Sequence, residues 1–137
     1  MYRRIMVPVD MNHVDQLEKA LTTAADLAKH YGAPVTYVGV TPETPSPVAH
    51  NPEEFARKLA NFAARQGEAH GLEADSKAIA SHDPAIDLDK TLLHAVKETG
   101  ADLVVMASNK PNITDWIWAS HGGDVASHAD VSVFLVR

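Results

Sequence analysis

Short apolar runs alternate along this chain with longer segments of helical periodicity, and this alternation constrains the fold more than any other feature. Four such runs lie at residues 5–9, 35–40, 103–107 and 131–136. Most of their residues are apolar or β-branched, which is typical of strands buried on both faces of a parallel sheet. Residues 72–80 predict a fifth, weaker strand, and because large apolar residues are scarce there we expect it at an edge.

Between the runs, apolar residues recur at spacings of three and four, as on the inward face of a helix. The first such segment extends from Val14 to Tyr31. Asn51-Pro52 and Asp83-Pro84 each place a capping side chain before a proline, which favours two further helix starts. A short last helix is expected at residues 120–128. The inward faces of the second and third helices are expected to carry Phe55, Leu59, Phe62, Ala63, Ile86, Leu92, Leu93 and Val96.

The resulting order, β-α-β-α-β-α-β-α-β, predicts a parallel sheet covered by helices on both faces. With 137 residues, the chain fits one domain spanning residues 1–137. We expect a doubly wound, five-stranded α/β sandwich of three layers, Rossmann-like or flavodoxin-like, with strand order 3-2-1-4-5. In such sheets ligands bind beyond the carboxyl ends of the strands where the order reverses, here between the first and fourth strands.

Composition excludes several classes of function. The net charge is -6 and no run of lysine and arginine occurs, which argues against binding to a nucleic-acid backbone. The chain has no cysteine, so disulfides, thiolate chemistry and zinc–sulfur sites are excluded. Asp10 interrupts the first apolar run, which is too short for a signal peptide, and no segment approaches the roughly 18 apolar residues of a membrane helix. We expect a cytoplasmic protein that is not embedded in a membrane.

Two residues at the predicted crevice, Asp10 and Ser120, have either a ligand-binding role or a purely structural one. Asp10 follows the first strand, and a carboxylate there can accept hydrogen bonds from ribose hydroxyls or hold a hydrated metal ion. It can equally be a turn residue that accepts local backbone N–H groups. Ser120 opens the last helix, whose positive end can receive a phosphate, or it is a cap and nothing more. Both alternatives stay open for each residue.

Other polar residues near the fourth strand are less specific. Lys110 can reach a phosphate as a point charge, although most surface lysines are only solvated. Ser108, Asn109 and His121 are further hydrogen-bonding candidates. The eight histidines form no helical pair at a spacing of four, as zinc-binding helices require, so we interpret them as isolated surface residues and expect no metal site.

Taken together, these segments resemble the universal stress protein family along essentially the whole chain. Residues 4–10 resemble the first strand of the family with its acidic end, residues 39–42 the end of its second strand, and residues 101–108 its fourth strand. Residues 119–137 are similar to its final helix and strand. The resemblance implies a stress-response regulatory protein rather than a conventional enzyme.

The loop after the fourth strand departs from the ATP-binding branch of that family, which carries G-x2-G-x9-G-[ST]. Here Ala107, Lys110 and Ala119 stand in the glycine positions, and the last interval is eight residues long. Glycine permits positive φ angles and close approach of the backbone to phosphate, so these replacements favour a protein without nucleotide. However, residues 107–114, A-S-N-K-P-N-I-T, resemble a subgroup with the pattern A-S-x-[RK]-P-x-I-T, which includes nucleotide-binding members.

Carried over to this chain, the subgroup implies a site for ATP or AMP, with or without Mg²⁺. Asp10 would meet the ribose, Val9 and Val40 would flank the adenine, and Ser120 and His121 would hold the phosphates. Ala107, Ser108 and Lys110 would line the ribose and the phosphates. The full set of implied binding residues is Pro8, Val9, Asp10, Val40, Ala107, Ser108, Lys110, Ser120 and His121.

The resemblance also implies a homodimer through the last strand, with Val131, Val133 and Leu135 near the contact, and a regulated protein such as a transporter as a further partner. An exposed strand at the edge of a sheet needs a partner on physical grounds as well. Two alternatives remain. One is a slow ATPase, for which only Asp10 offers itself as a general base and no Walker lysine is present. The other is a nucleotide-free dimeric interaction module.

Overall fold

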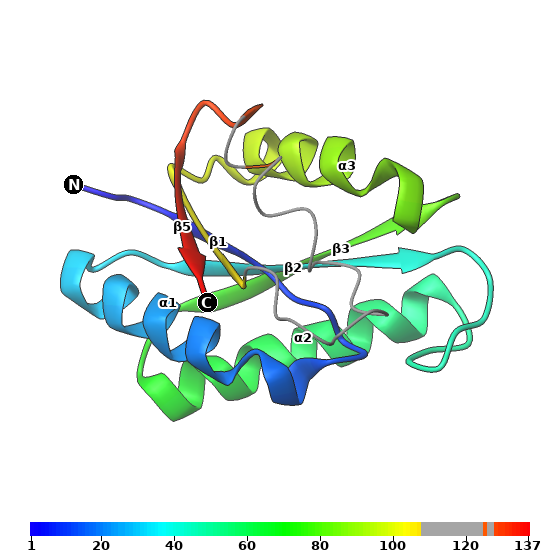
Figure 1. The fold of residues 1–137 in the computed structure, drawn as a ribbon. Helices are drawn as coiled ribbons and strands as arrows, with labels where there is room; N and C mark the ends of the chain where they lie inside the picture. The colour runs from blue at the N-terminus through cyan, green and yellow to red at the C-terminus, as the bar shows by residue number, and fades with distance from the viewer. Residues whose placement is uncertain (108–124, 126–127) are drawn as a thin grey trace.

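The computed structural model describes residues 1–107, 125 and 128–137 of the chain. Five parallel strands form one sheet with the order β3-β2-β1-β4-β5, as predicted (Figure 1). The weak strand predicted at residues 72–80 is indeed an edge strand. The strands are β1 (Ile5–Pro8), β2 (Val35–Pro42), β3 (Ala74–Ser81), β4 (Leu103–Ala107) and β5 (Ser132–Val136).

Three helices cover the sheet from both sides. Figure 1 shows α1 (Glu18–Tyr31) and α2 (Pro52–His70) on one face and α3 (Pro84–Thr99) on the other, so the α/β sandwich has the three layers that the sequence predicts. The helix predicted at residues 120–128 falls mostly outside the described residues. None of the helices in the described part of the chain is long and apolar enough to cross a membrane.

The helix predicted from Val14 to Tyr31 is divided in two. A short 3-10 helix, η1 (Val14–Gln16), comes first, and α1 begins only at Glu18. Leu17 separates them because its N–H donates to the carbonyl of Val14, three residues back, instead of continuing an α-helical turn. The predicted end at Tyr31 is confirmed, since the next residue, Gly32, adopts a left-handed conformation with φ 63° and stops the helix.

The two predicted proline-containing helix starts differ in their capping. The Asn51 side chain accepts a hydrogen bond from the Glu54 N–H over 2.8 Å, so it caps α2 as predicted. Asp83 occupies the same position before α3, but its side chain makes no capping hydrogen bond, and this part of the prediction is wrong. Its ψ of 84° differs from the fully extended ψ of 167° at Asn51. A residue pattern can place a capping residue, but the backbone geometry decides whether its side chain reaches the helix.

Ile86 was expected on the inward face of α3, and this is wrong, because 78% of its surface is exposed. Leu92 and Val96 are buried as predicted, and Leu88 and Ala95 are buried beside them. Ile86 precedes Leu88 by two residues, which places it about 200° away around the helix axis. The start of α3 therefore presents a large apolar side chain to solvent.

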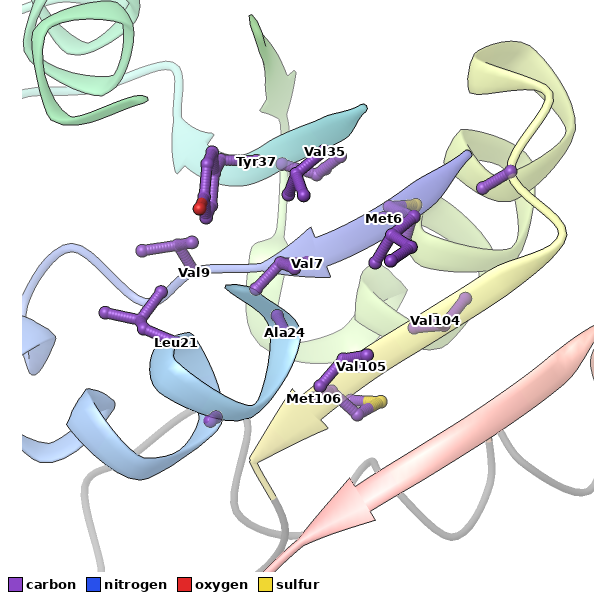
Figure 2. Close-up of a cluster of buried hydrophobic side chains, with 14 of the residues drawn as sticks. Met6, Val7, Val9, Leu21, Ala24, Val35, Tyr37, Val104, Val105 and Met106 are labelled. Atoms are coloured by element: carbon purple, nitrogen blue, oxygen red, sulfur yellow. The ribbon is translucent and has the colours of Figure 1, made fainter. Parts of the chain in front are cut away.

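The hydrophobic core extends over the two central strands, β1 and β4, which are buried along their whole length. Figure 2 shows part of this cluster, with side chains from β1, β2, β4 and α1. Tyr37 of β2 is fully buried in it, with its ring edge-on to Phe62 at a centroid distance of 5.5 Å. Among the described residues the Tyr37 hydroxyl has no hydrogen-bond partner, and burial raises the pKa of this phenol to about 12.

Gly39 of β2 sits where α2 approaches the sheet most closely. A Cβ atom at this position would lie 2.8 Å from Cζ of Phe55 and 3.1 Å from Cδ2 of Leu59. The absence of a side chain therefore allows these two α2 residues to pack directly on the strand. This contact holds α2 against the β2–β3 half of the sheet.

Candidate functional site

The direction of strand addition reverses between β1 and β4, the two central strands. From β1 the chain adds β2 and β3 on one side, and then crosses to add β4 and β5 on the other. Ile5 and Met6 of β1 pair in parallel with Leu103 and Val104 of β4, so the carboxyl ends of both strands lie at the same edge of the sheet. The predicted strand order is confirmed, and open α/β sheets bind ligands where that order reverses. A ligand crevice at this position stays a prediction.

Apolar residues from β1 and β2 lie at this carboxyl edge. Pro8 ends β1 and pairs with Val38 of β2, and the Val9 N–H then donates to the Val38 carbonyl over 2.8 Å. Val40 lies two residues farther along β2 and is partly buried, whereas Pro8 and Val9 are buried. The structure thus brings these three predicted residues to one end of neighbouring strands. Their role as walls around an adenine stays a prediction.

Asp10 follows them, and only 5% of its surface is exposed. Its Oδ1 accepts the Asn12 N–H over 3.0 Å, and its Oδ2 lies 3.0 Å from Nδ1 of His13. The Asp10 carbonyl accepts the His13 N–H, which closes a tight turn. Of the two roles open to Asp10, the local turn contact is therefore present. The carboxylate has further acceptor capacity, since an ionised carboxylate can accept about four hydrogen bonds and the described part of the chain supplies two.

On the other side of the crevice, Ala107 is the last residue of β4 and is buried, paired with Val136 of β5. The remaining predicted binding residues, Ser108, Lys110, Ser120 and His121, lie outside the described residues, as does Asn109. The predicted contacts to phosphate therefore stay predictions. Within the described ranges, no group of three or more histidine, aspartate or glutamate side chains is arranged to hold a metal ion.

His13 is the residue that sequence reasoning missed. The histidines were interpreted as isolated surface residues, and for His13 this is wrong, because only 17% of its side chain is exposed and its ring contacts Asp10. A signal was present in the sequence. An acid directly after a buried strand and a histidine three residues later are separated by one tight turn, which brings the two side chains to the same side.

At the other end of the strands, where β1 and β4 begin, a different aspartate makes the structural contacts. Asp102, which precedes β4, accepts the backbone N–H groups of Arg3 and Arg4 over 2.9–3.1 Å and so ties the amino ends of β1 and β4 together. Burial raises the pKa of this carboxyl, but the two backbone donors outweigh it and hold the pKa below its usual value. The carboxylate oxygens of Asp102 thus join the starts of β1 and β4. The Asp10 carboxylate, near the carboxyl ends of these strands, accepts fewer hydrogen bonds from the described residues than it can.

Known proteins of the same fold and sequence family match this chain over its whole length. A family model described as the universal stress protein family matches residues 1–137. Universal stress protein G of Shigella flexneri is 28% identical over 148 residues, with full coverage of both chains.

Several similar solved structures carry the same family name. A universal stress protein from Archaeoglobus fulgidus has a TM-score of 0.73 at 23% identity and covers both chains completely. One from the same organism, in complex with dAMP, has a TM-score of 0.70 at 22% identity, covering 99% of this chain and 98% of its own. Another, in complex with cAMP, has a TM-score of 0.70 at 17% identity, with coverages of 99% and 97%. Because the family model spans every residue from 1 to 137, the chain belongs to the universal stress protein family.

Proposed function

We propose that this chain is a stress-response regulatory protein that binds an adenine nucleotide, ATP or AMP, at the carboxyl ends of β1 and β4. The observation that carries the proposal is the buried carboxylate of Asp10, which lies at the reversal of strand order and retains acceptor capacity. A buried carboxylate is costly unless its oxygens are hydrogen-bonded. A ribose, with hydroxyl groups as donors, matches this requirement.

The surroundings of Asp10 support the same ligand class. Val40 is only partly buried at the end of β2 and supplies apolar surface for a planar base, and the neighbouring Val9 is buried beside it at the end of β1. Ser108, Lys110, Ser120 and His121 are proposed to contact the phosphates. The complexes of two relatives with dAMP and with cAMP support an adenine nucleotide as the ligand, and here this is a proposal for a chain of the same fold.

Calorimetric titration with ATP, ADP and AMP tests the proposal, using both metal-stripped and Mg²⁺-loaded protein. We expect saturable binding of at least one nucleotide with one site per chain. Asp10→Asn should weaken that binding about tenfold, since it removes the charge of the acceptor but preserves its shape. The matched control is Asp15→Asn, at an exposed aspartate five residues farther along the chain. Failure of every nucleotide to bind at millimolar concentration would contradict the proposal.

Ser120 provides a second variant for the phosphate end of the ligand. Ser120→Ala should weaken AMP and ATP more than adenosine if the hydroxyl contacts phosphate. Equal losses for all three ligands would contradict that role. Phosphate release during prolonged incubation with ATP measures whether the protein also turns over as a slow ATPase.

The exposed edge of the sheet supports homodimerisation as part of the same proposal, and equally the alternative of a nucleotide-free interaction module. Phe134 and Leu135 of β5 are large apolar residues that expose 46% and 36% of their surface. β5 pairs with β4 on one side and has no strand on its other side in the described sheet. We propose that two copies associate along β5, with Val131, Val133 and Leu135 at the contact. A monomeric mass by light scattering at micromolar concentration would contradict this.

A further inference from the structure

A carboxylate–histidine pair lies at the carboxyl end of β1, where the nucleotide is proposed to bind. Asp10 is the second residue after β1, and His13 directly precedes η1. The His13 Nδ1 and the Asn12 N–H each approach a different oxygen of the Asp10 carboxylate, both over 3.0 Å. Both members of the pair are largely withdrawn from solvent, so their contact is not a solvated surface ion pair.

Of the two groups that approach the Asp10 carboxylate, one is a backbone N–H and the other belongs to a side chain. Every residue except proline at position 12 provides a backbone N–H for Oδ1, whereas the contact with Oδ2 depends on the ring of His13. An ionised carboxylate only accepts hydrogen bonds, so the ring must donate from Nδ1 for the contact to be attractive. A carboxylate partner of this kind selects the ring form that carries a proton on Nδ1.

Backbone hydrogen bonds fix the main chain of His13 on both sides. The His13 N–H donates to the Asp10 carbonyl and the Gln16 N–H donates to the His13 carbonyl, each over 3.0 Å. The next turn is closed by the hydrogen bond from Leu17 to Val14. A side chain mounted on such a turn loses little conformational freedom when it engages a partner, which is the condition for a preorganised contact.

We propose that His13 is a positioning residue that holds the Asp10 carboxylate in a fixed orientation, so that its remaining acceptor capacity serves the ribose hydroxyls. This inference rests on the proposed nucleotide-binding function. Without the ring, the buried Oδ2 loses the donor from His13, and the carboxylate rotates toward another donor. In the proposed site, Asp10 contacts neither the adenine nor the phosphates. The effect of His13 should therefore be confined to ligands that carry ribose hydroxyls.

The test compares AMP with 2′,3′-dideoxy-AMP, which lacks both ribose hydroxyls, by calorimetry on the full chain. The unmodified protein should bind AMP more tightly. His13→Leu should weaken AMP about tenfold and leave dideoxy-AMP nearly unchanged, so that the preference disappears. His13→Asn should restore most of the preference, because its amide nitrogen lies at the same number of bonds from Cβ as Nδ1. His30→Leu, at an exposed histidine in the last turn of α1, is the matched control.

The outcomes separate this inference from the function on which it rests. No binding of AMP by the unmodified protein overturns both together. Binding of AMP with the same ratio to dideoxy-AMP in the unmodified protein and in His13→Leu overturns only the role of His13. Equal weakening of both ligands indicates a general structural effect, which also contradicts the inference, as does failure of His13→Asn to restore the preference. Thermal melting of each variant confirms that the compared proteins are folded.

Discussion

The two edges of the sheet are built in opposite ways. β3 has eight residues and includes two charged side chains, and α2 packs along it. Lys77 pairs with Glu98 of α3 at 2.8 Å, and Asp75 accepts a hydrogen bond from the Thr36 hydroxyl at 2.6 Å. β5 has five residues, S-V-F-L-V, none of them charged. Charged side chains on an edge strand oppose pairing with another chain, whereas an apolar edge invites it.

This difference indicates that the halves of the sheet are stabilised by different means. The hydrogen bond from Lys77 holds the pKa of Glu98 below its usual value, which shows that the charges at the β3 edge are engaged within the chain. The apolar side chains at the β5 edge remain partly exposed in a single copy. We therefore expect substitutions near β3 to change the stability of the monomer, and substitutions in β5 to change its assembly.

The largest expected effect comes from comparing one substitution in each half of the sheet. Leu59 of α2 is fully buried in the core, so Leu59→Ala should reduce the free energy of unfolding by about 3 kcal/mol. Leu135→Ala should cost about 1 kcal/mol or less under monomeric conditions, because the side chain is already partly exposed. Urea denaturation of dilute protein measures both. Equal losses of stability would remove the distinction between the two halves.

A charge at the β5 edge tests assembly directly. Phe134→Asp should raise the dissociation constant of the dimer at least tenfold, or about 1.4 kcal/mol, because a contact that excludes water must then accommodate a carboxylate. Ala80→Asp places the same charge at an exposed position of β3 and should leave the molecular mass unchanged. Light scattering over a concentration series measures both variants. Dissociation caused by Ala80→Asp instead would assign the contact to the wrong edge.

The smallest expected effect concerns the interior beside the β3 half. Tyr37→Phe removes a buried hydroxyl that has no hydrogen-bond partner in the described part of the chain, and it should stabilise the fold by about 1 kcal/mol at neutral pH. The phenol has a pKa near 10 when unfolded and about 12 in the fold. The folded state therefore favours the neutral phenol. The free energy of unfolding has its full value below pH 10 and falls as the pH rises from 10 toward 12.

The stability difference between Tyr37→Phe and the unmodified protein should accordingly grow above pH 10, since only the tyrosine is pulled toward the unfolded state by ionisation. Urea denaturation at pH 8 and pH 11 measures this difference. A variant less stable than the unmodified protein at pH 8 would show that the hydroxyl has a partner in solution, such as an internal water.

Much of the fold was predictable because the decisive signals are local. The buried strands 5–9 and 103–107 appear as continuous apolar runs, and the weakness of residues 72–80 correctly indicated an edge. The errors have a common physical origin. The exposed Ile86 depends on the rotational phase of α3, and this phase is set by how the helix packs on the sheet and not by the sequence pattern alone.

The candidate site was predictable in position and only partly in composition. The strand order located the crevice and identified Asp10, because switch points of parallel sheets follow from topology. The contact between Asp10 and His13 was not foreseen, since neither periodicity nor composition specifies the turn that joins them.

The sequence by itself determined the alternation of strands and helices, and with it the sheet, its central strands and the carboxyl edge at which a ligand can bind. These follow from apolar periodicity and from the handedness of parallel crossovers, which act along short stretches of chain. Only the tertiary structure decided that Asp10 is buried with a histidine partner, that the Tyr37 hydroxyl is unpaired within the described ranges, and that β5 exposes its apolar side chains. Burial and hydrogen bonding depend on which distant segments meet, and that information exists only once the chain has packed.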